Sequence, residues 1–329
     1  MASIKNRLDE TFELMDKKIG KLSFPRKLYV LADIVNSKRV YKANKIDYFQ
    51  YGFYNLKKGA REQFVTIGKL SEFHHTSNDK EKSKIFSEKA QFVKVFKDFI
   101  GRDVLDMNTA SFEEFSDFTQ KHDKMFIKPE DGTYGMGVEI LDCSPENARE
   151  LYEKLKGKNI LAEELVKQHP ELAAFNSSSL NSVRIVTFLR KNGEAVVMPG
   201  SVIRVGRKGR IADNFHHMGM GAQIDNETGI ICTTGIDKAG NRYITHPDSN
   251  ISLLGFKVPH WDKVKETVLA AAKVVPEVRY VGWDVAITDD DRVILIEGND
   301  RADPDLGQMS DRTGKWPEFK KYLDELRNN

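Results

Sequence analysis

The stretch RYVGWDVAITDDDRVILIEGNDRADPDL, residues 279–306, decides the fold. Residues 280–288 are rich in Val, Ile and aromatic side chains, residues 292–297 are mostly aliphatic, and three aspartates at 289–291 separate them. β-Branched and aromatic residues favour strands, and Asp favours turns. The stretch therefore predicts two antiparallel strands joined by a tight acidic turn.

Three oxygen-bearing side chains lie on this hairpin. Glu297 and Asn299 point to the same face of the second strand because strand side chains alternate, and Asp284 on the first strand lies roughly opposite them. Carboxylate and amide oxygens suit Mg²⁺, which also binds substrate phosphates. The alternative is a solvated turn and strand, but Glu297 stands where the apolar run ending at Ile296 leaves the core. The hairpin is predicted to hold a Mg²⁺-nucleotide.

The composition is that of an ordinary globular protein, with 329 residues, 40% hydrophobic and 30% charged. A net charge of +2, from 51 basic and 49 acidic residues, gives no reason to expect a nucleic-acid or membrane partner. Cys143 and Cys232 are too few for a disulfide framework and lack the spacing of a zinc site. The N-terminus is too charged for a secretory signal and no apolar run is long enough to span a membrane, so a cytoplasmic enzyme is expected.

Residues 1–80 are predicted to be mostly helical, with the polar stretch after His74 as a loop. Aromatic residues are dense between Tyr41 and Tyr54 and alternate with Lys and Arg. Such a pattern is compatible with a stacking surface for single-stranded nucleic acid. The interpretation we favour is that helices dock these aromatic rings on the next lobe.

A glycine-rich loop lies in FIKPEDGTYGMGVEIL, residues 126–141, between two predicted strands. It follows a predicted helix that begins at Ser83 and ends at Gly101, and another at residues 112–122. Glycines let backbone N–H groups approach phosphate oxygens, and Lys128 adds a positive charge. The loop is not a Walker motif, because no GK[ST] follows and it joins strand to strand. A plain hairpin turn is the alternative.

Further strands carry charged residues in apolar surroundings. The strand at 160–166 carries Glu163 and Glu164, and can act as a hinge that reads an adenine edge and the ribose, or face solvent. Arg184 and Arg204 lie on a predicted pair of strands, 181–190 and 195–204. An arginine in an apolar strand needs an anion, either a phosphate or a structural carboxylate.

The polar loop DNFHHMGMGA, residues 213–222, is predicted to belong to the active site. It contains Asn214, His216 and His217. Either histidine can serve as a base for an attacking amine or can simply form hydrogen bonds within the loop. Residues 262–275 and 316–326 are predicted to be helices.

Taken together, these pieces resemble the ATP-grasp superfamily and, within it, the sugar-transfer-associated ATP-grasp proteins. The matching stretches are FIKPEDGTYGMGV, ILAEELVKQHPEL, NSVRIVTFL, SVIRVGRKGRIADNFHHMG and GWDVAITDDDRVILIEGND, within residues 83–306. The spacing of 13 residues from Asp284 to Glu297 and of 2 from Glu297 to Asn299 is similar to that of D-alanine–D-alanine ligases.

The resemblance implies an α+β ATP-grasp fold, in which two α+β lobes grip ATP between antiparallel sheets. A helical N-terminal region at 1–80 would precede a small lobe at 81–160 with the glycine-rich loop and a large lobe at 161–329 with the metal triad. The N-terminal Rossmann-like lobe usual in this superfamily is not evident in the sequence.

The resemblance also implies the cofactors, ATP and two Mg²⁺ ions, and a role for each matching residue. The metal ligands would be Asp284, Glu297 and Asn299. The nucleotide-binding residues would be Lys89, Lys128, Gly132, Thr133, Gly135, Gly137, Glu163, Glu164 and Glu171. The resemblance would make Arg184, Arg204 and Asn214 catalytic. Apart from it, His216 is a candidate base, and Arg301, in a stretch that departs from the family pattern, is a candidate contact for a substrate carboxylate.

The reaction implied is an ADP-forming ligation of a carboxylate to an amine through an acyl phosphate. The family description suggests surface polysaccharide or sugar-conjugate biosynthesis, with small-molecule substrates that include a sugar-linked one. Two alternatives remain open. One is a kinase for a sugar or polyol hydroxyl. The other is a nucleotide-binding module without turnover, which the intact triad and both lysines argue against.

Overall fold

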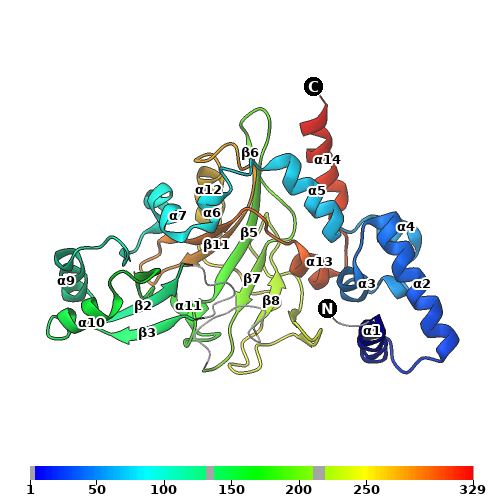
Figure 1. The fold of residues 1–329 in the computed structure, drawn as a ribbon, viewed down its shortest axis with the longest axis horizontal. Helices are drawn as coiled ribbons and strands as arrows, with labels where there is room; N and C mark the ends of the chain where they lie inside the picture. The colour runs from blue at the N-terminus through cyan, green and yellow to red at the C-terminus, as the bar shows by residue number, and fades with distance from the viewer. Residues whose placement is uncertain (1–3, 131–136, 210–218, 329) are drawn as a thin grey trace. The chain divides into compact units, whose positions relative to one another are not determined.

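The computed structural model describes residues 4–130, 137–209 and 219–328. The chain forms two compact units, one of residues 1–73 with 312–321 and one of residues 74–311 with 322–329. Figure 1 traces both along the chain. Each unit is described by itself. No helix in the described ranges is long and apolar enough to cross a membrane.

The first unit is helical, as the sequence predicts. Its elements are α1 (Ile4–Lys18), α2 (Phe24–Tyr41), α3 (Lys45–Gln50), a 3₁₀ turn (Phe53–Asn55) and α4 (Lys58–Glu62), while α5 (Ile67–Ser77) and α14 (Trp316–Arg327) contribute residues to both units. Asn44 caps α3: its side-chain oxygen accepts from the Asp47 amide, and the Asp47 carboxylate accepts from the Asn44 amide, so the chain turns sharply after α2.

The dense aromatic residues of the first unit form its core. Tyr41, Tyr48, Phe49, Tyr51 and Phe53 are all buried, and Tyr51 stacks on Phe64 with ring centroids 4.8 Å apart. Buried rings cannot stack on nucleic-acid bases, so the stacking-surface interpretation is wrong. The favoured interpretation also needs correction, because these rings pack within their own unit.

The second unit begins with a four-stranded antiparallel sheet in the order β1-β4-β2-β3. Its strands are β1 (Val104–Asp106), β2 (Lys124–Pro129), β3 (Glu139–Asp142) and β4 (Ile160–Glu164), and its helices are α9 (Phe112–Lys121) and α10 (Ala148–Leu155). Met125 of β2 packs with Phe115 and Phe118 of α9 and Leu155 of α10 in one core. The predicted strands on either side of the glycine-rich loop are therefore neighbours in this sheet.

An eight-stranded sheet follows, in the order β10-β9-β8-β7-β5-β11-β12, with β6 paired to β5. Its strands are β5 (Ser182–Leu189), β6 (Ala195–Val197), β7 (Val202–Val205), β8 (Met220–Gln223), β9 (Gly235–Asp237), β10 (Arg242–Tyr243), β11 (Tyr280–Ile287) and β12 (Val293–Asn299). The associated helices are α6 (Lys84–Ser87), α7 (Lys89–Val95), α8 (Lys97–Ile100), α11 (Pro170–Ala173), α12 (Trp261–Ala271) and α13 (Asp305–Asp311). The organising hairpin, β11–β12, is thus part of the larger sheet.

Side-chain alternation divides the two faces of this sheet. Val281, Trp283 and Val285 of β11 enter the main core, where Trp283 meets Phe96 with ring centroids 5.4 Å apart and α12 adds Val264. Because these odd-numbered positions face the core, the even-numbered positions of β11, Asp284 among them, lie on the opposite face. One face is therefore covered by apolar packing, and the other carries the polar residues.

Three sequence predictions need correction. Residues 74–77 continue helix α5 rather than starting a loop, because the half-buried His74 packs on Tyr280 at a centroid distance of 5.1 Å. The helix predicted from Ser83 to Gly101 is three short helices, with Gly101 at φ +59°. The strand predicted at 195–204 is split into β6 and β7 around Gly200, at φ +100°.

His74 makes stability sensitive to acid. Burial lowers the pKa of His74 from 6.5 to about 4. The unfolded chain therefore takes up a proton before the folded chain does, and stability falls as pH drops from 6.5 to 4. We expect His74→Phe, which keeps a ring on Tyr280, to remove on the order of 3 kcal/mol of this loss. Urea unfolding of both proteins from pH 7 to pH 4 measures it. If the free energy of unfolding falls equally with pH in both proteins, the assignment to His74 is contradicted.

Candidate functional site

Four charged residues of the predicted site lie on one face of the large sheet. Glu297 on β12 is directly opposite Asp284 on β11, which is directly opposite Arg184 on β5. Arg204 on β7 pairs with Ser182, two residues from Arg184, and therefore shares the same face. Strand register brings together residues that are up to 113 positions apart in the sequence.

Asp284 is the centre of this group. Both Arg184 and Arg204 bind it: the Nη2 of Arg184 is 2.7 Å from Oδ2, the Nε of Arg184 donates to Oδ1, and the Nη1 of Arg204 lies 3.1 Å from Oδ2. All three side chains are largely buried. Burial alone raises the pKa of Asp284, but Arg184 and then Arg204 outweigh it and hold that pKa well below its usual range. Asp284 is thus a permanent buried anion.

Glu297 is the weakly compensated carboxylate. Among the described residues its nearest cationic atoms are the Nζ of Lys128 and the Nη2 of Arg184, both 3.9 Å away, and the amide nitrogen of Asn299 donates to its Oε1 at 3.2 Å. Partial burial, followed by the negative charge of Asp284, raises the pKa of Glu297. A carboxylate whose charge is disfavoured by burial and by a facing carboxylate favours a bound cation.

The lysines of the predicted phosphate site lie on the small sheet and on α7. Lys89 begins α7 and donates from Nζ to the carbonyl oxygen of Glu130, directly after β2, which carries Lys128. The Glu130 carboxylate in turn accepts from the Ala90 amide at 3.1 Å. Both lysines lower the pKa of Glu163 across the sheet. The hydrogen bond from Lys89 to Glu130 thus places Lys89 beside the end of the strand that carries Lys128.

The three glutamates of the predicted hinge have different surroundings. Glu163 is buried and paired with Arg102 at 2.9 Å; burial opposes its ionisation, but Arg102 and the lysines lower its pKa. Glu164 accepts from the Asp103 amide at 3.0 Å, and Glu171 is exposed at the start of α11. The Glu163 carboxylate is already engaged, and the backbone of β4 pairs with β1 on one side and β2 on the other. The end of β4 and the chain directly after Glu164 are therefore the part of the predicted hinge left to read an adenine edge.

Other predicted residues are not brought into this group. Arg301 is 79% exposed and its ion pair is with Asp300, at 3.8 Å. Gly137 has a φ of +75°, and a Cβ there would come within 3.0 Å of Pro129, so the glycine is required where the loop rejoins the sheet. The predictions for Gly132, Thr133, Gly135, Asn214 and His216, and the question about His217, lie outside the described residues.

Two residues of the site have no counterpart in the sequence analysis. Arg102 binds Glu163 and also donates to the carbonyl oxygen of Leu295 on β12, at 2.8 Å. Glu130 positions Lys89. A carboxylate directly after Lys128-Pro129 was a local signal for Glu130, whereas Arg102 lies 61 residues from its partner and has no such signal.

The donor set fits a divalent cation bound to a polyphosphate. The carboxylates of Asp284 and Glu297 and the amide oxygen of Asn299 are the hard ligands that Mg²⁺ prefers. The Nε of Arg204 is buried and has no hydrogen-bond partner among the described residues. A buried donor without a partner is costly, and a phosphate oxygen is the kind of group that would satisfy it.

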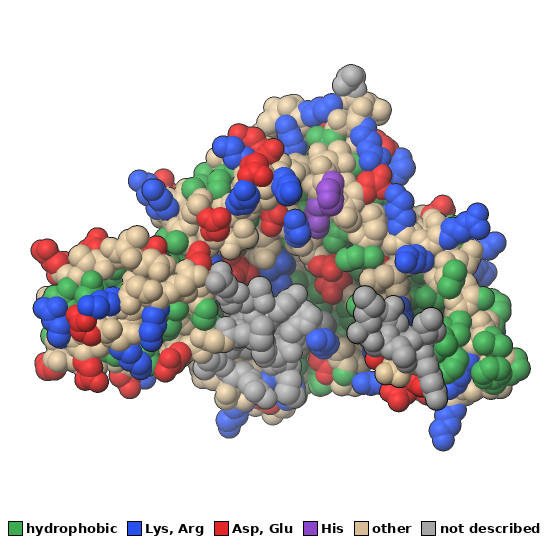
Figure 2. Space-filling model, in the orientation of Figure 1, with side chains coloured by type: hydrophobic (Ala, Val, Ile, Leu, Met, Phe, Trp, Pro, Cys, Tyr) green, Lys and Arg blue, Asp and Glu red, His purple; other side chains and the backbone are tan. Residues whose placement is uncertain are grey.

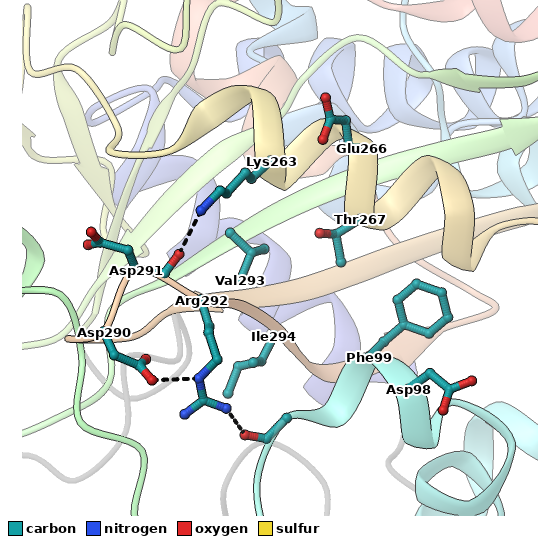
Figure 3. A pocket seen from close by; sticks show the side chains of 11 residues that line it. Asp98, Phe99, Lys263, Glu266, Thr267, Asp290, Asp291, Arg292, Val293 and Ile294 are labelled. Atoms are coloured by element: carbon teal, nitrogen blue, oxygen red, sulfur yellow. Dashed lines mark hydrogen bonds and ion pairs between the residues drawn. The ribbon is translucent and has the colours of Figure 1, made fainter.

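A separate cavity of about 350 Å³ lies at the far end of β12, between α8 and α12 (Figure 3). Two of its cations have partners: Arg292 binds Asp290 at 2.7 Å and the carbonyl oxygen of Gly101 at 2.5 Å, and Lys263 reaches the carbonyl oxygen of Asp291 at 3.3 Å. None of the predicted site residues lines it. We assign it no role in the reaction.

The two carboxylates are expected to respond oppositely to neutralisation. Asp284→Asn leaves Arg204 without its carboxylate partner and Arg184 with only Glu297, 3.9 Å away, and should cost about 3 kcal/mol of folding stability or more. Glu297→Gln removes a carboxylate whose charge is disfavoured by Asp284, so stability without Mg²⁺ should be unchanged or higher at pH 7. Denaturant unfolding of both variants measures this. Loss of stability in Glu297→Gln of the size seen in Asp284→Asn would contradict the account.

Comparison with solved structures finds several ATP-grasp enzymes. The ATP-grasp ligase PsnB complexed with minimal precursor has a TM-score of 0.45 and 15% identity, covering 76% of this chain and 64% of PsnB. D-alanyl-alanine synthetase A from Vibrio cholerae has a TM-score of 0.45 and 12% identity, over 75% and 67% of the two chains. N5-carboxyaminoimidazole ribonucleotide synthetase from Thermotoga maritima has a TM-score of 0.43 and 12% identity, over 75% and 50%. The chain thus spans less than two thirds of PsnB.

Similarity at this level transfers neither substrate nor activity to this chain, and no curated protein sequence matches it. A family model described as sugar-transfer associated ATP-grasp, however, matches residues 69–322. That span covers more than half of the 329 residues, including both sheets and the charged face. The chain is a member of the sugar-transfer associated ATP-grasp family and has the ATP-grasp fold.

Proposed function

We propose that this protein is an ATP-dependent carboxylate–amine ligase that releases ADP and phosphate. The observation that carries the proposal is the row Glu297, Asp284 and Arg184 across three neighbouring strands, with Arg204 beside it and Lys128 within ion-pair distance. This arrangement combines ligands for a divalent cation with cations for phosphates. Membership in the ATP-grasp family supports the same nucleotide.

The nucleotide would lie between the two sheets of the second unit. Asp284, Glu297 and Asn299 would hold Mg²⁺, which would neutralise the phosphates and polarise the γ-phosphate. Lys89 and Lys128 would bind the α- and β-phosphates. The loop that includes Gly132, Thr133 and Gly135 and ends at Gly137 would cover them, the β4 strand would contact adenine, and Glu171 is the candidate for the ribose.

The arginines are proposed to change partner during binding. In the structure Arg184 and Arg204 bind the carboxylate oxygens of Asp284. A cation at Asp284 would take over part of this charge compensation, and the guanidinium groups would then be free for phosphate oxygens. Arginine suits this role because its planar donors bind carboxylate and phosphate equally well.

The chemistry proceeds in two displacements. A substrate carboxylate oxygen attacks the γ-phosphorus, the bond to the β-phosphate oxygen breaks, and ADP leaves with that electron pair. The amine nitrogen then attacks the acyl carbon, phosphate leaves, and the nitrogen loses a proton to give the amide. Arg184 and Arg204 stabilise the charge on the phosphoryl group. His216 is a candidate for accepting the proton, Asn214 for the acyl group and Arg301 for a substrate carboxylate.

The substrates are proposed to be a small carboxylic acid and an amine, one of them linked to a sugar. The family description is the support for that setting, which would be surface polysaccharide or sugar-conjugate biosynthesis. Dependence on ATP would place the reaction in the cytoplasm.

An assay with hydroxylamine tests the proposal without knowledge of the natural amine, because hydroxylamine intercepts an acyl phosphate. The purified protein is given Mg²⁺-ATP, hydroxylamine and a panel of amino acids and uronic acids. We expect hydroxamate, ADP and free phosphate in equal amounts for one acid. Glu297→Gln should lower the rate on the order of 10²-fold or more, while the exposed Glu194→Gln should not.

Two outcomes would overturn the proposal. ADP formed with phosphate retained on a sugar, and no hydroxamate, would make the protein a kinase. The second outcome is ATP binding, measured by titration calorimetry, without any release of ADP when the small metabolites of a crude extract are supplied as possible substrates. That result would make the protein a nucleotide-binding module without turnover.

A further inference from the structure

Helix α2 is apolar on both of its sides. Its buried side includes Val30 and Tyr41, which pack into the first unit. Its solvent side carries large apolar side chains too, with exposed fractions of 64% for Phe24, 59% for Tyr29 and 69% for Val35. Large apolar side chains gathered on the solvent side of a helix commonly mark an interaction site. The solvent side of α2 therefore has the character of a contact surface.

The exposed apolar residues of this protein are concentrated around α2. Of the 13 large hydrophobic side chains that are exposed in the described ranges, eight lie between residues 8 and 67, and five of these are on α2 itself. Figure 2 shows hydrophobic side chains gathered over α2 with basic side chains around them. Single exposed apolar residues are ordinary, but a contiguous group marks an interaction site. We call these five, Phe24, Leu28, Tyr29, Val35 and Val40, the α2 patch.

The charge around the α2 patch is strongly positive. Residues 20–46 contain seven basic residues and one acidic residue, a net charge of +6 in a chain whose total is +2. The acidic residue, Asp33, is tied to Arg61 at 2.7 Å. Lys21, Arg26, Lys38 and Arg39 are exposed. The nearly neutral total of the chain hides a basic segment, and this segment coincides with the apolar patch.

The positions of these residues suit a flat surface. The 18 residues of α2 give a length of about 27 Å. Phe24, Leu28 and Val35 follow one another along one side of the helix, with Lys21 and Arg26 at one end and Lys38 and Arg39 at the other. Arg26 lies over the ring of Tyr29, 4.7 Å from its centroid. A helix lying flat can therefore insert its apolar side chains while basic groups at both ends remain at the surface.

The positive charge around the α2 patch also distinguishes between its possible binding partners. In a symmetric dimer the same patch faces itself, so basic residues would oppose basic residues, which disfavours a second copy of this chain. An anionic lipid bilayer satisfies both features, since it accepts apolar side chains into its interface and attracts basic residues to its headgroups. We propose that α2 docks this protein on the surface of an anionic membrane, with the helix parallel to the bilayer.

Vesicle sedimentation tests the proposal. The full-length protein is mixed with vesicles of phosphatidylcholine alone or with 30% phosphatidylglycerol added, as chosen compositions, at two salt concentrations. We expect binding to the anionic vesicles only, weakened by salt. Lys38→Ala with Arg39→Ala should weaken binding roughly 25-fold, since each basic residue near the surface strengthens binding about five-fold. The matched control is Lys57→Ala with Lys58→Ala, a basic pair of the same unit that is exposed and off α2.

A second variant tests the apolar part. Phe24→Ser with Val35→Ser should abolish sedimentation, while Ile244→Ser, which removes a comparably exposed residue elsewhere, should not. Melting curves by circular dichroism verify that each variant is folded. No binding of the wild-type protein to anionic vesicles would overturn the proposal, as would binding unaffected by both α2 variants. Concentration-dependent dimerisation lost in the Phe24→Ser, Val35→Ser variant would assign the patch to a second copy instead.

Discussion

The rest of the site depends on two ion pairs, which the buried carboxylate of Asp284 makes with Arg184 and Arg204. A single buried charge without partners would be too costly to keep, and here two guanidinium groups compensate it. The register of β5, β7 and β11 places these three side chains on one face of the sheet. The apolar residues on the other face fix that register, because a shift by one residue would bury the charges and expose the core.

This arrangement separates the roles of two carboxylates that look equivalent in sequence. Asp284 is compensated before any ligand binds, whereas Glu297 is left with cations no nearer than 3.9 Å and a raised pKa. Asp284 is therefore the carboxylate with its charge compensated, and Glu297 is the one whose charge is left to be stabilised by a ligand. A cation held by both carboxylates would relieve the repulsion and free the arginines, so we propose that cation and phosphate binding are coupled through the same residues.

Much of this could be predicted from the sequence, and the reasons why are local. Alternation and turn chemistry suffice to place Asp284 opposite Glu297, and the structure pairs them in register. The sequence also indicates that Arg184 and Arg204 need an anion, but it leaves phosphate and carboxylate open, because strand order is set by long-range pairing. The pairing of Arg102 with Glu163 cannot be predicted for the same reason, because the two residues lie 61 positions apart. Helix α5 extends to Ser77, beyond the predicted start of the loop, because the burial of His74 outweighs the polar character of its neighbours.

The most direct test of the central claim is a crystal structure with Mn²⁺ and a non-hydrolysable ATP analogue, read from the anomalous signal of the metal. We predict a metal peak bounded by Asp284, Glu297 and Asn299, with Arg184 or Arg204 moved onto a phosphate oxygen. An ordered nucleotide whose metal lies away from these residues, with both arginines still on Asp284, would contradict the account.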